Sequence, residues 1–383
     1  MTPNPHTVRF SAPPLAVAAQ SAAQRVLGSG WFTTGPECGA FEEELAAYLG
    51  QPHVVTLTSC THALELSLRA LRLEPGSVVL TPSLTFCGAV AAITHAGYRP
   101  VLIDIDETTL VPDEAAVQRA AQRHQPAAMM LCELGGYKVD HVALARAAGL
   151  PYRRIIMDAA HGPGGLVGRA DAATAPFATC LSFYATKNLP IGEGGAVATH
   201  DDELNEWLRR MRLHGMSKDA WRRYLPGGSW RYDVPEIGYK ANLTDLQAAI
   251  GREQLRALPA WQERRAELVA RYDAALAPAV DAGALRQPAR PDGHALHLYQ
   301  VLVRDKRDEV AAALGEAGIG TSVHFIPVHQ LTGYANLLGP DECAAVPVTD
   351  RVADQILSLP LYPDLTDDDV DLVTKTLTEL VGR

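Results

Sequence analysis

Short apolar runs alternate with amphipathic stretches between residues 54 and 200. The runs carry many β-branched side chains and end in turn formers or charged residues, which is typical of buried strands. Five strands are predicted, namely Val54–Thr58, Val78–Thr81, Val101–Asp104, Met129–Cys132 and Ile155–Asp158. Helical spacing predicts four helices between them, namely His62–Leu71, Gly88–His95, Asp113–Arg123 and Val142–Ala148. This alternation predicts a parallel sheet covered by helices on both faces, with ligands bound beyond the carboxyl ends of the strands.

The pattern changes after the apolar run Ala196–Thr199. Asp201–Met211 combines an acidic first turn with a basic last turn, which favours a helix. A loop rich in glycine, tryptophan and arginine is predicted to follow, from about His214 to Gly238. No internal repeat or low-complexity segment stands out. Because the pattern changes, a second, differently built domain is expected beyond this loop.

The C-terminal third is predicted to begin with long helices. Asn242 is interpreted as the N-cap of a helix that runs through Leu258, and a further helical run lies around Trp261–Leu276. We therefore predict an α/β fold with a large domain over residues 1–250, which includes the N-terminal segment. A smaller α+β domain is predicted over residues 251–383.

Composition excludes several classes of function. The chain has 383 residues, of which 47% are hydrophobic and 20% charged, as in globular proteins. Its net charge of −10 disfavours binding to nucleic acid or to an anionic membrane, because phosphate contacts need a basic face. No apolar run approaches the roughly 18 residues of a membrane span, and Met1–His6 lacks the layout of a secretory signal. A cytoplasmic protein with six reduced, unpaired cysteines is expected.

Three common catalytic signatures are absent from the sequence: the GxGxxG dinucleotide motif, the P-loop and the GxSxG elbow of serine hydrolases. His324 and His329 are five residues apart across a proline, which fits one helical metal-binding face poorly. We therefore predict no metal site.

Two charged residues stand at predicted strand ends. Lys187 follows a short apolar strand and precedes the glycine-rich turn Gly192–Gly195, whose glycines let a ligand approach the backbone. Asp158 ends another strand, and a buried carboxylate there needs a cationic partner such as a protonated pyridine nitrogen. A surface lysine and a carboxylate that caps the next turn are the structural alternatives.

Two further segments complete the set. Ser59-Cys60-Thr61 joins a strand to a helix, where Ser59 acts as an N-cap or free backbone N–H groups form a phosphate site. Phe86 follows a strand in a chain with only 6% aromatic residues, and it belongs either to the core or to a platform on which a ring stacks. Each segment alone is ambiguous, but together they indicate one cofactor, pyridoxal phosphate.

The chain order of phosphate site, aromatic, carboxylate and lysine is that of pyridoxal-phosphate enzymes with the aspartate-aminotransferase fold. More narrowly, the sequence resembles the sugar aminotransferases of the DegT/DnrJ/EryC1/StrS family from Gly30 to its C-terminus. The matching motifs are Gly30–Pro36, Asp158–His161, Ser182–Asn188 with Gly192–Gly195, Arg212–Ser217 and Gly238–Ala249. The sequence departs from the family where Cys60 replaces a frequent glycine and where Glu133–Tyr137 replaces a histidine-glycine stretch.

The resemblance implies roles around the cofactor ring. Lys187 would form the Schiff base with the cofactor and move a proton during amino transfer. Asp158 would keep the pyridine nitrogen protonated. His161 would lie near the phenolic oxygen of the ring, and Phe86 would stack on the ring face.

The resemblance also implies a phosphate site that two subunits share. The backbone amides of Cys60 and Thr61 and the hydroxyl of Ser182 would bind the phosphate. Asn242 matches an asparagine that the neighbouring subunit contributes in this family. A homodimer with shared active sites is therefore expected.

The substrates follow from the same resemblance. The family transfers an amino group from L-glutamate or L-glutamine to nucleotide-linked keto-sugars, and this sequence is most similar to members that act at C-4 of a 4-keto-6-deoxy sugar. Related dehydratases carry histidine in place of Lys187, so a transaminase is expected. Lys218 and Arg231 could bind the nucleotide diphosphate, and His324 could contact the substrate. A solvated loop and a structural histidine are the alternatives.

Other functions remain open at this point. Within the family, the chain could aminate a cyclic ketone such as an inosose, or synthesise an aminohydroxybenzoate. From other classes come a non-catalytic regulator that binds pyridoxal phosphate and a different lysine-dependent enzyme such as a β-lyase. Intact Lys187 and Asp158 argue against the regulator.

Overall fold

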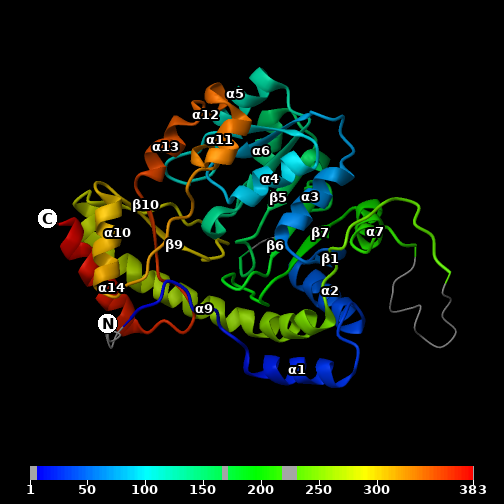
Figure 1. The fold of residues 1–383 in the computed structure, drawn as a ribbon. Coiled ribbons are helices and arrows are strands. Elements are labelled where there is room, and N and C mark those ends of the chain that lie inside the picture. Colours follow the sequence, from blue (N-terminus) through cyan, green and yellow to red (C-terminus); the bar gives the residue numbers. More distant parts are fainter. Residues whose placement is uncertain (1–6, 166–170, 218–230, 383) are drawn as a thin grey trace.

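The computed structural model describes residues 7–165, 171–217 and 231–382, and it has two sheets of different size (Figure 1). The large sheet has the strand order β1-β7-β6-β5-β4-β2-β3. Its strands are β1 (His53–Leu57), β2 (Val78–Pro82), β3 (Arg99–Ile103), β4 (Ala128–Cys132), β5 (Ile155–Asp158), β6 (Ala178–Ser182) and β7 (Gly195–Thr199). Strand β7 runs antiparallel to β1 and β6, and the other neighbouring pairs are parallel. The carboxyl ends of β1 to β6 therefore lie at one edge of the sheet.

The five strands predicted from the sequence are confirmed, each within two residues of its predicted bounds. Every residue of β4, β5, β6 and β7 is buried, as expected for strands covered on both faces. Alternate side chains serve opposite layers: Val55 packs in the cluster that contains α3, whereas Val54 packs in the cluster that contains α2.

Helices cover both faces of the large sheet. The helices of this domain are α1 (Val17–Gly28), α2 (Pro36–Leu49), α3 (Cys60–Ala70), α4 (Cys87–His95), α5 (Glu114–His124), α6 (His141–Ala148) and α7 (Asp202–Met211), with short 3-10 turns η1 (Leu134–Gly136) and η2 (Tyr152–Arg154). Residues of α3, α4 and α7 pack on one face. Residues of α5 and α6 cover part of the other face, and α2 with the first half of α9 (Asp245–Asp281) covers the rest.

The smaller domain combines a sheet with helices, which agrees with the predicted α+β class, and its strands pair antiparallel. Its strand order is β10-β9-β8. Its elements are β8 (Leu285–Arg286), β9 (Tyr299–Val303), α10 (Arg307–Glu316), η3 (Val328–Gln330), α11 (Thr332–Leu338), α12 (Pro340–Cys343), α13 (Pro347–Ala353), β10 (Ile356–Leu359) and α14 (Asp367–Val381). The N-terminal segment joins this domain, because Val8 forms a parallel bridge with Ile319 and packs in the same core.

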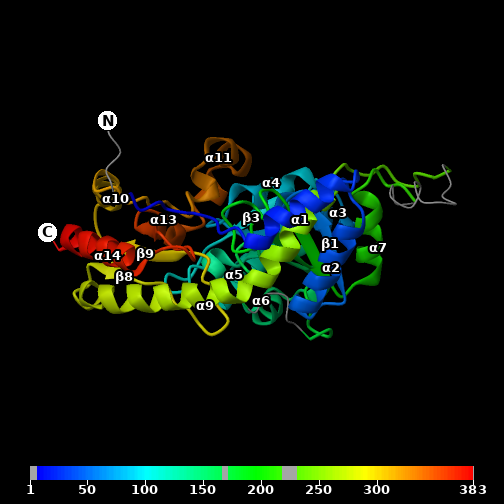
Figure 2. The same ribbon diagram turned by 90° about the horizontal axis from the view of Figure 1, so that it is seen from below.

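One 37-residue helix, α9, links the two domains (Figures 1 and 2). Its first half contributes Leu255 and Leu258 to the large domain's core, and its second half contributes Leu268 and Tyr272 to the small domain's core. Residue 250, where the sequence places the domain boundary, lies inside this helix. The prediction of two successive helices is wrong, because burial against both cores carries the helix through Pro259.

The predicted N-cap of this helix is also wrong. Thr244, and not Asn242, caps α9: its Oγ1 accepts the N–H of Gln247, and the Gln247 side chain accepts the N–H of Thr244 in a capping box.

Among the described residues, no helix is both long enough and apolar enough to cross a lipid bilayer.

Candidate active site

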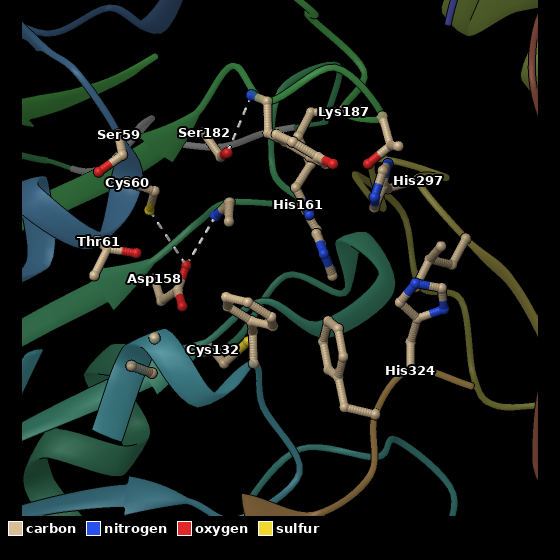
Figure 3. Close-up of a pocket in the computed structure, with 18 of the residues that line it drawn as sticks. Ser59, Cys60, Thr61, Cys132, Asp158, His161, Ser182, Lys187, His297 and His324 are labelled. Carbon is tan, nitrogen blue, oxygen red and sulfur yellow. Dashed lines mark hydrogen bonds between the residues drawn. The ribbon is translucent and has the colours of Figure 1, made fainter. Parts of the chain in front are cut away.

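A cavity of about 420 Å³ opens at the carboxyl edge of the large sheet, between that edge and the small domain (Figure 3). It brings together eight residues singled out in the sequence: Cys60, Thr61, Phe86, Asp158, His161, Ser182, Lys187 and His324. It also contains residues that the sequence analysis missed, among them Phe10, Ser11, Cys132 and His297. The edge is where parallel α/β sheets hold ligands, as the sequence predicts.

The amino end of α3 forms an anion-binding surface in this cavity. Ser59 caps the helix, since its Oγ accepts the N–H of His62 at 3.1 Å and its carbonyl accepts the N–H of Ala63 at 3.1 Å. Within the described chain, the N–H groups of Cys60 and Thr61 have no acceptor. Free N–H groups at the positive end of a helix dipole bind phosphate. Ser182 adds a hydroxyl, whose oxygen accepts the N–H of Tyr184 and whose proton stays available.

Gly195 lets this surface form. It begins β7 and lies directly against the turn that enters α3. A Cβ at this position would approach the carbonyl carbon of Ser59 at 2.4 Å and the amide nitrogen of Cys60 at 2.5 Å. Any side chain at residue 195 would therefore displace the backbone of the anion site. Within the glycine-rich turn singled out in the sequence, Gly195 has this steric role.

Asp158 is a buried carboxylate at the end of β5, with 6% of its surface exposed. Its Oδ1 accepts the N–H of Ala160 at 3.1 Å, and the Cys60 thiol lies 3.7 Å from the same oxygen. Burial raises the pKa of Asp158, although the Ala160 N–H and the charge of Lys187 oppose the rise. Its Oδ2 accepts no hydrogen bond from the residues that the structure describes, so a cation in the cavity would complete the site.

Lys187 lies in the loop between β6 and β7 and lines the same cavity. Burial lowers the pKa of its amine, whereas the charge of Asp158 raises it. In the described part of the chain, Nζ makes no ion pair or hydrogen bond. An unpaired, half-buried amine with a lowered pKa carries more of the neutral, nucleophilic form than an ordinary lysine.

His161 presents a hydrogen-bond donor to the cavity. Its Nδ1 accepts the N–H of Gly135 at 3.0 Å, so the proton of the neutral ring is on Nε2. Burial and the charge of Lys187 lower its pKa well below the ordinary value, which keeps the ring neutral. Gly135 belongs to the segment that departs from the family pattern, and its left-handed backbone (φ +66°) places this N–H.

Aromatic side chains form the remaining walls. Phe86 exposes 56% of its surface, and its ring lies 5.9 Å from that of Phe325. Phe325 in turn stacks on His161 at 5.9 Å. His324 stacks on Phe10 at 5.4 Å, and its Nδ1 is hydrogen-bonded to the Ser358 Oγ at 3.0 Å. Burial lowers the pKa of His324 to about 4, so this ring is also neutral.

Three predicted site residues are not among the described residues that line the cavity. Asn242 does not line the cavity of its own subunit, and its Nδ2 donates to the Thr34 Oγ1 at 2.6 Å. Arg231 is exposed and does not line the cavity. Lys218 lies outside the described residues. Of the residues that the structure describes, Asn242 and Arg231 therefore do not line the cavity of their own chain.

The missed residues come mostly from segments distant in sequence. Phe10 and Ser11 belong to the N-terminal segment, and nothing in their local pattern marks them as cavity residues. His297 stands just before the apolar run of β9, and a histidine at the start of a strand could have marked it as a candidate cavity residue.

Among the described residues, no group of three or more histidine, cysteine or carboxylate side chains is placed to hold a metal ion.

The fold and the cavity define an aminotransferase. The chain belongs to the DegT/DnrJ/EryC1/StrS aminotransferase family, whose profile matches residues 15–378. The spore coat polysaccharide biosynthesis protein SpsC of Bacillus subtilis is 40% identical over an alignment 383 residues long. The alignment covers 98% of this chain and 97% of SpsC. The family predicted from the sequence motifs is confirmed.

Solved structures agree with this assignment. The putative sugar aminotransferase Spr1654 of Streptococcus pneumoniae, in its PLP-form, has a TM-score of 0.88 at 29% identity and covers 98% of this chain and 99% of its own. DesV of S. venezuelae, in complex with a ketimine intermediate, has a TM-score of 0.83 at 32% identity and covers 95% and 94%. Spr1654 has also been solved in a PMP-form. The cofactor predicted from the sequence is thus the one that this similar protein carries.

The residues present in the cavity fit pyridoxal phosphate. The two free N–H groups at the start of α3 suit its phosphate, and the unpaired Oδ2 of Asp158 suits a protonated pyridine nitrogen. The amine of Lys187 suits its aldehyde. Burial raises the pKa of the Cys60 thiol well above its ordinary value, so this thiol stays protonated and does not compete as a nucleophile.

Proposed function

We propose that this protein transfers an amino group from L-glutamate or L-glutamine to a nucleotide-linked keto-sugar, with pyridoxal phosphate as cofactor. The C-4 ketone of a nucleoside-diphosphate 4-keto-6-deoxy sugar is the proposed acceptor. One observation carries the proposal: in a member of an aminotransferase family, the unpaired amine of Lys187 shares a cavity with buried Asp158 and with the free N–H groups of α3.

The proposed cofactor contacts divide between phosphate and ring. The N–H groups of Cys60 and Thr61 and the Ser182 hydroxyl bind the phosphate. Asp158 Oδ2 binds the pyridine nitrogen and keeps it protonated. His161 donates its Nε2 proton to the phenolic oxygen, and Phe86 covers the ring face. The hydrogen bonds that fix Asp158 Oδ1 and His161 Nδ1 support this division, because they leave one atom of each side chain for the cofactor.

Pyridoxal phosphate supplies an aldehyde carbon that can exchange one amine for another and a ring that withdraws electrons from the bonds next to it. The residues of this chain supply the rest. Lys187 would hold the cofactor through Nζ at the aldehyde carbon, whose oxygen leaves as water, and once the amino donor has displaced it the free amine would accept and return the proton at Nζ. Phe86, Phe325 and His324 line the cavity around that amine.

The acceptor sugar is proposed to bind on the side of His324. This residue lines the cavity next to Phe10, away from the helix that would hold the phosphate. Lys218 and Arg231 are proposed to bind the nucleotide diphosphate. The names of similar proteins support a sugar substrate: Spr1654 is described as a putative sugar aminotransferase, and SpsC as a polysaccharide biosynthesis protein.

Transfer of labelled nitrogen tests the reaction. The purified protein is incubated with pyridoxal phosphate, ¹⁵N-labelled L-glutamate and, separately, thymidine- or uridine-diphosphate 4-keto-6-deoxy sugars or an inosose. We expect ¹⁵N in a nucleotide-linked aminosugar and an equal amount of 2-oxoglutarate. Label in aminated inosose alone would replace the proposed acceptor with a cyclic ketone. A second series with L-glutamine labelled with ¹⁵N at its amino group covers the other proposed donor. No label in any product of either series would refute the proposed donors and acceptors.

We further propose a homodimer in which Asn242 completes the phosphate site of the partner. Large apolar side chains that are exposed on the single chain support a contact with a second copy of the chain. Among them are Phe32 (57% exposed) and Ile237 (91% exposed). Mixed dimers of Lys187→Ala and Asn242→Ala subunits test the sharing. If sites are shared, one site per mixed dimer has both native residues and activity returns. If mixed dimers form and are stable but show no activity, the proposal that two subunits share each site is contradicted.

A further inference from the structure

Three buried thiols surround the carboxylate of Asp158. Asp158 ends β5, and its partners in register on the two neighbouring strands are Cys132 on β4 and Cys180 on β6. The third thiol belongs to Cys60, the first residue of α3. All three cysteines are buried. The function proposed above uses the backbone of Cys60 and gives no role to any of these side chains.

Only one of the three thiols is hydrogen-bonded to the carboxylate. The Cys60 Sγ lies 3.7 Å from the Asp158 Oδ1 and donates to it (Figure 3). The Cys180 Sγ lies 3.6 Å from the Ser67 Oγ instead. Within the described part of the chain, neither Cys132 nor Cys180 is hydrogen-bonded to Asp158. Geometry therefore distinguishes Cys60 from the other two cysteines.

The proton in this contact belongs to the sulfur. Burial raises the pKa of the Cys60 thiol well above its ordinary value, and the charge of Asp158 raises it further. An ionised carboxylate only accepts hydrogen bonds, so the thiol is the donor. The same oxygen of Asp158 accepts the N–H of Ala160 at 3.1 Å. Two donors therefore meet at Oδ1, and Oδ2 stays available to the cavity.

Asp158 needs donors because of its burial. Burial raises its pKa, whereas the Ala160 N–H, the charge of Lys187 and the Cys60 thiol lower it. A protonated Asp158 would be neutral and could not balance the charge of a protonated pyridine nitrogen. The titratable groups that face Asp158 are Lys187, Glu133, Cys60, Cys132 and Cys180.

We propose that Cys60 is a positioning residue for Asp158, whose Oδ1 accepts the thiol hydrogen bond and whose carboxylate is thereby held in its ionised form. Cys60 then serves the cofactor through two groups, its backbone N–H at the phosphate and its thiol at the carboxylate that binds the ring. The inference rests on the proposed function, in which Asp158 Oδ2 binds the pyridine nitrogen.

Two alanine variants separate the hydrogen bond from the mere loss of a buried thiol. Cys60→Ala removes the donor and keeps the backbone N–H at the phosphate site. Cys180→Ala removes a thiol that is also buried beside Asp158 but is not bonded to it, so it is the matched control. Circular dichroism establishes that both variants are folded.

The pH dependence of ligand binding reports the charge of Asp158. The affinity for 4′-deoxypyridoxine phosphate, which has the ring and phosphate but no aldehyde, is measured by fluorescence titration over a range of pH. Binding weakens on the acid side as Asp158 takes up a proton. We expect this weakening to begin at higher pH in Cys60→Ala, which should bind about threefold more weakly than the wild type there, as for a weak hydrogen bond.

The same titration contains its own controls. Cys60→Ala should match the wild type at the alkaline end, where Asp158 is ionised in both proteins. Cys180→Ala should follow the wild type at every pH. The remaining groups that titrate near Asp158, among them Glu133, are present in all three proteins, so they do not contribute to the difference.

The hydrogen bond itself is tested on the apo-protein by infrared spectroscopy. S–H groups absorb in a window that is free of other protein bands, and the difference between wild type and Cys60→Ala isolates the band of Cys60. A thiol that donates to a carboxylate absorbs at lower frequency than one with a neutral acceptor, because the bond to a charged acceptor is stronger. We therefore expect the Cys60 band to move to higher frequency in an Asp158→Asn background. An unmoved band would overturn the inference.

The binding results can also overturn it. Equal affinities of wild type and Cys60→Ala at every pH would exclude a role of the thiol. A loss of the same size at every pH, or an equal loss in Cys180→Ala, would make Cys60 a packing residue. A wild type that does not bind the analogue would refute the proposed cofactor site itself. A wild type that binds it, with an unmoved Cys60 band, would refute only the role of Cys60.

Discussion

Substitution of Gly195 by alanine is predicted to weaken cofactor binding through the backbone alone. The new Cβ would lie 2.4 Å from the carbonyl carbon of Ser59, whereas ordinary contacts begin at 3.4 Å. Ser59 and Cys60 must therefore move by about 1 Å, and the contacting atoms are backbone and cannot rotate away. The displaced groups are the N–H donors proposed for the phosphate.

The size of the effect follows from those donors. A hydrogen bond to a charged group contributes about 1.5 kcal/mol or more, and two such bonds are disturbed. The loss of about 3 kcal/mol corresponds to roughly 100-fold weaker binding of pyridoxal phosphate. Titration of the apo-proteins with pyridoxal phosphate, followed by absorbance, measures it. Circular dichroism establishes that Gly195→Ala is folded.

Gly315→Ala is the matched control. Gly315 lies in α10, and a Cβ there meets nothing within 4 Å. This variant should bind the cofactor with wild-type affinity. Its free energy of unfolding should be higher by about 0.5–1 kcal/mol, because alanine favours the helix. A folded Gly195→Ala protein with wild-type affinity would refute the placement of the phosphate at the start of α3.

Three further predictions concern other parts of the structure. Thr244→Ala removes the capping box of α9 and should lower the free energy of unfolding by about 1 kcal/mol in urea titrations without changing cofactor affinity; unchanged stability would contradict the cap. Burial raises the pKa of Glu133 from 4.5 to about 7, so the folded protein holds a proton that the unfolded chain releases, and stability falls as pH rises through this interval. Apo Glu133→Gln should therefore be more stable than the wild type at about pH 8 and equal to it at about pH 4, and equal stability at both would exclude the buried carboxylic acid. Phe86→Ala should bind pyridoxal phosphate about tenfold more weakly, as expected for the loss of one stacked ring, and an unchanged affinity would remove Phe86 from the cofactor site.

Local patterns account for much of the predicted fold. The strands of the large sheet are buried on both faces, so their apolar runs are short, continuous and bounded by polar residues. The same patterns place Asp158, Ser182 and the start of α3 at strand ends, and parallel strands bring those ends to one edge. The cavity could therefore be predicted from residues whose roles depend on their position in a strand.

The remaining features depend on contacts between distant segments. Helix α9 continues past Pro259 because both domains bury its apolar side chains, and no local signal reports that burial. His297 enters the cavity through a hydrogen bond to Asn188, a residue 109 positions earlier in the chain. Phe10 reaches His324 only because Val8 pairs with Ile319. Such contacts could not be derived from one segment at a time.

The central claim is that Lys187 is the amine through which this protein carries out amino transfer. The most direct measurement is the visible spectrum of the wild type and of Lys187→Ala with pyridoxal phosphate, before and after addition of L-glutamate or L-glutamine. We expect a yellow band in the wild type alone, and its loss on addition of a donor with release of the corresponding 2-oxo acid. A wild type without the band, or a Lys187→Ala protein that shows the same band and the same loss, would contradict the claim.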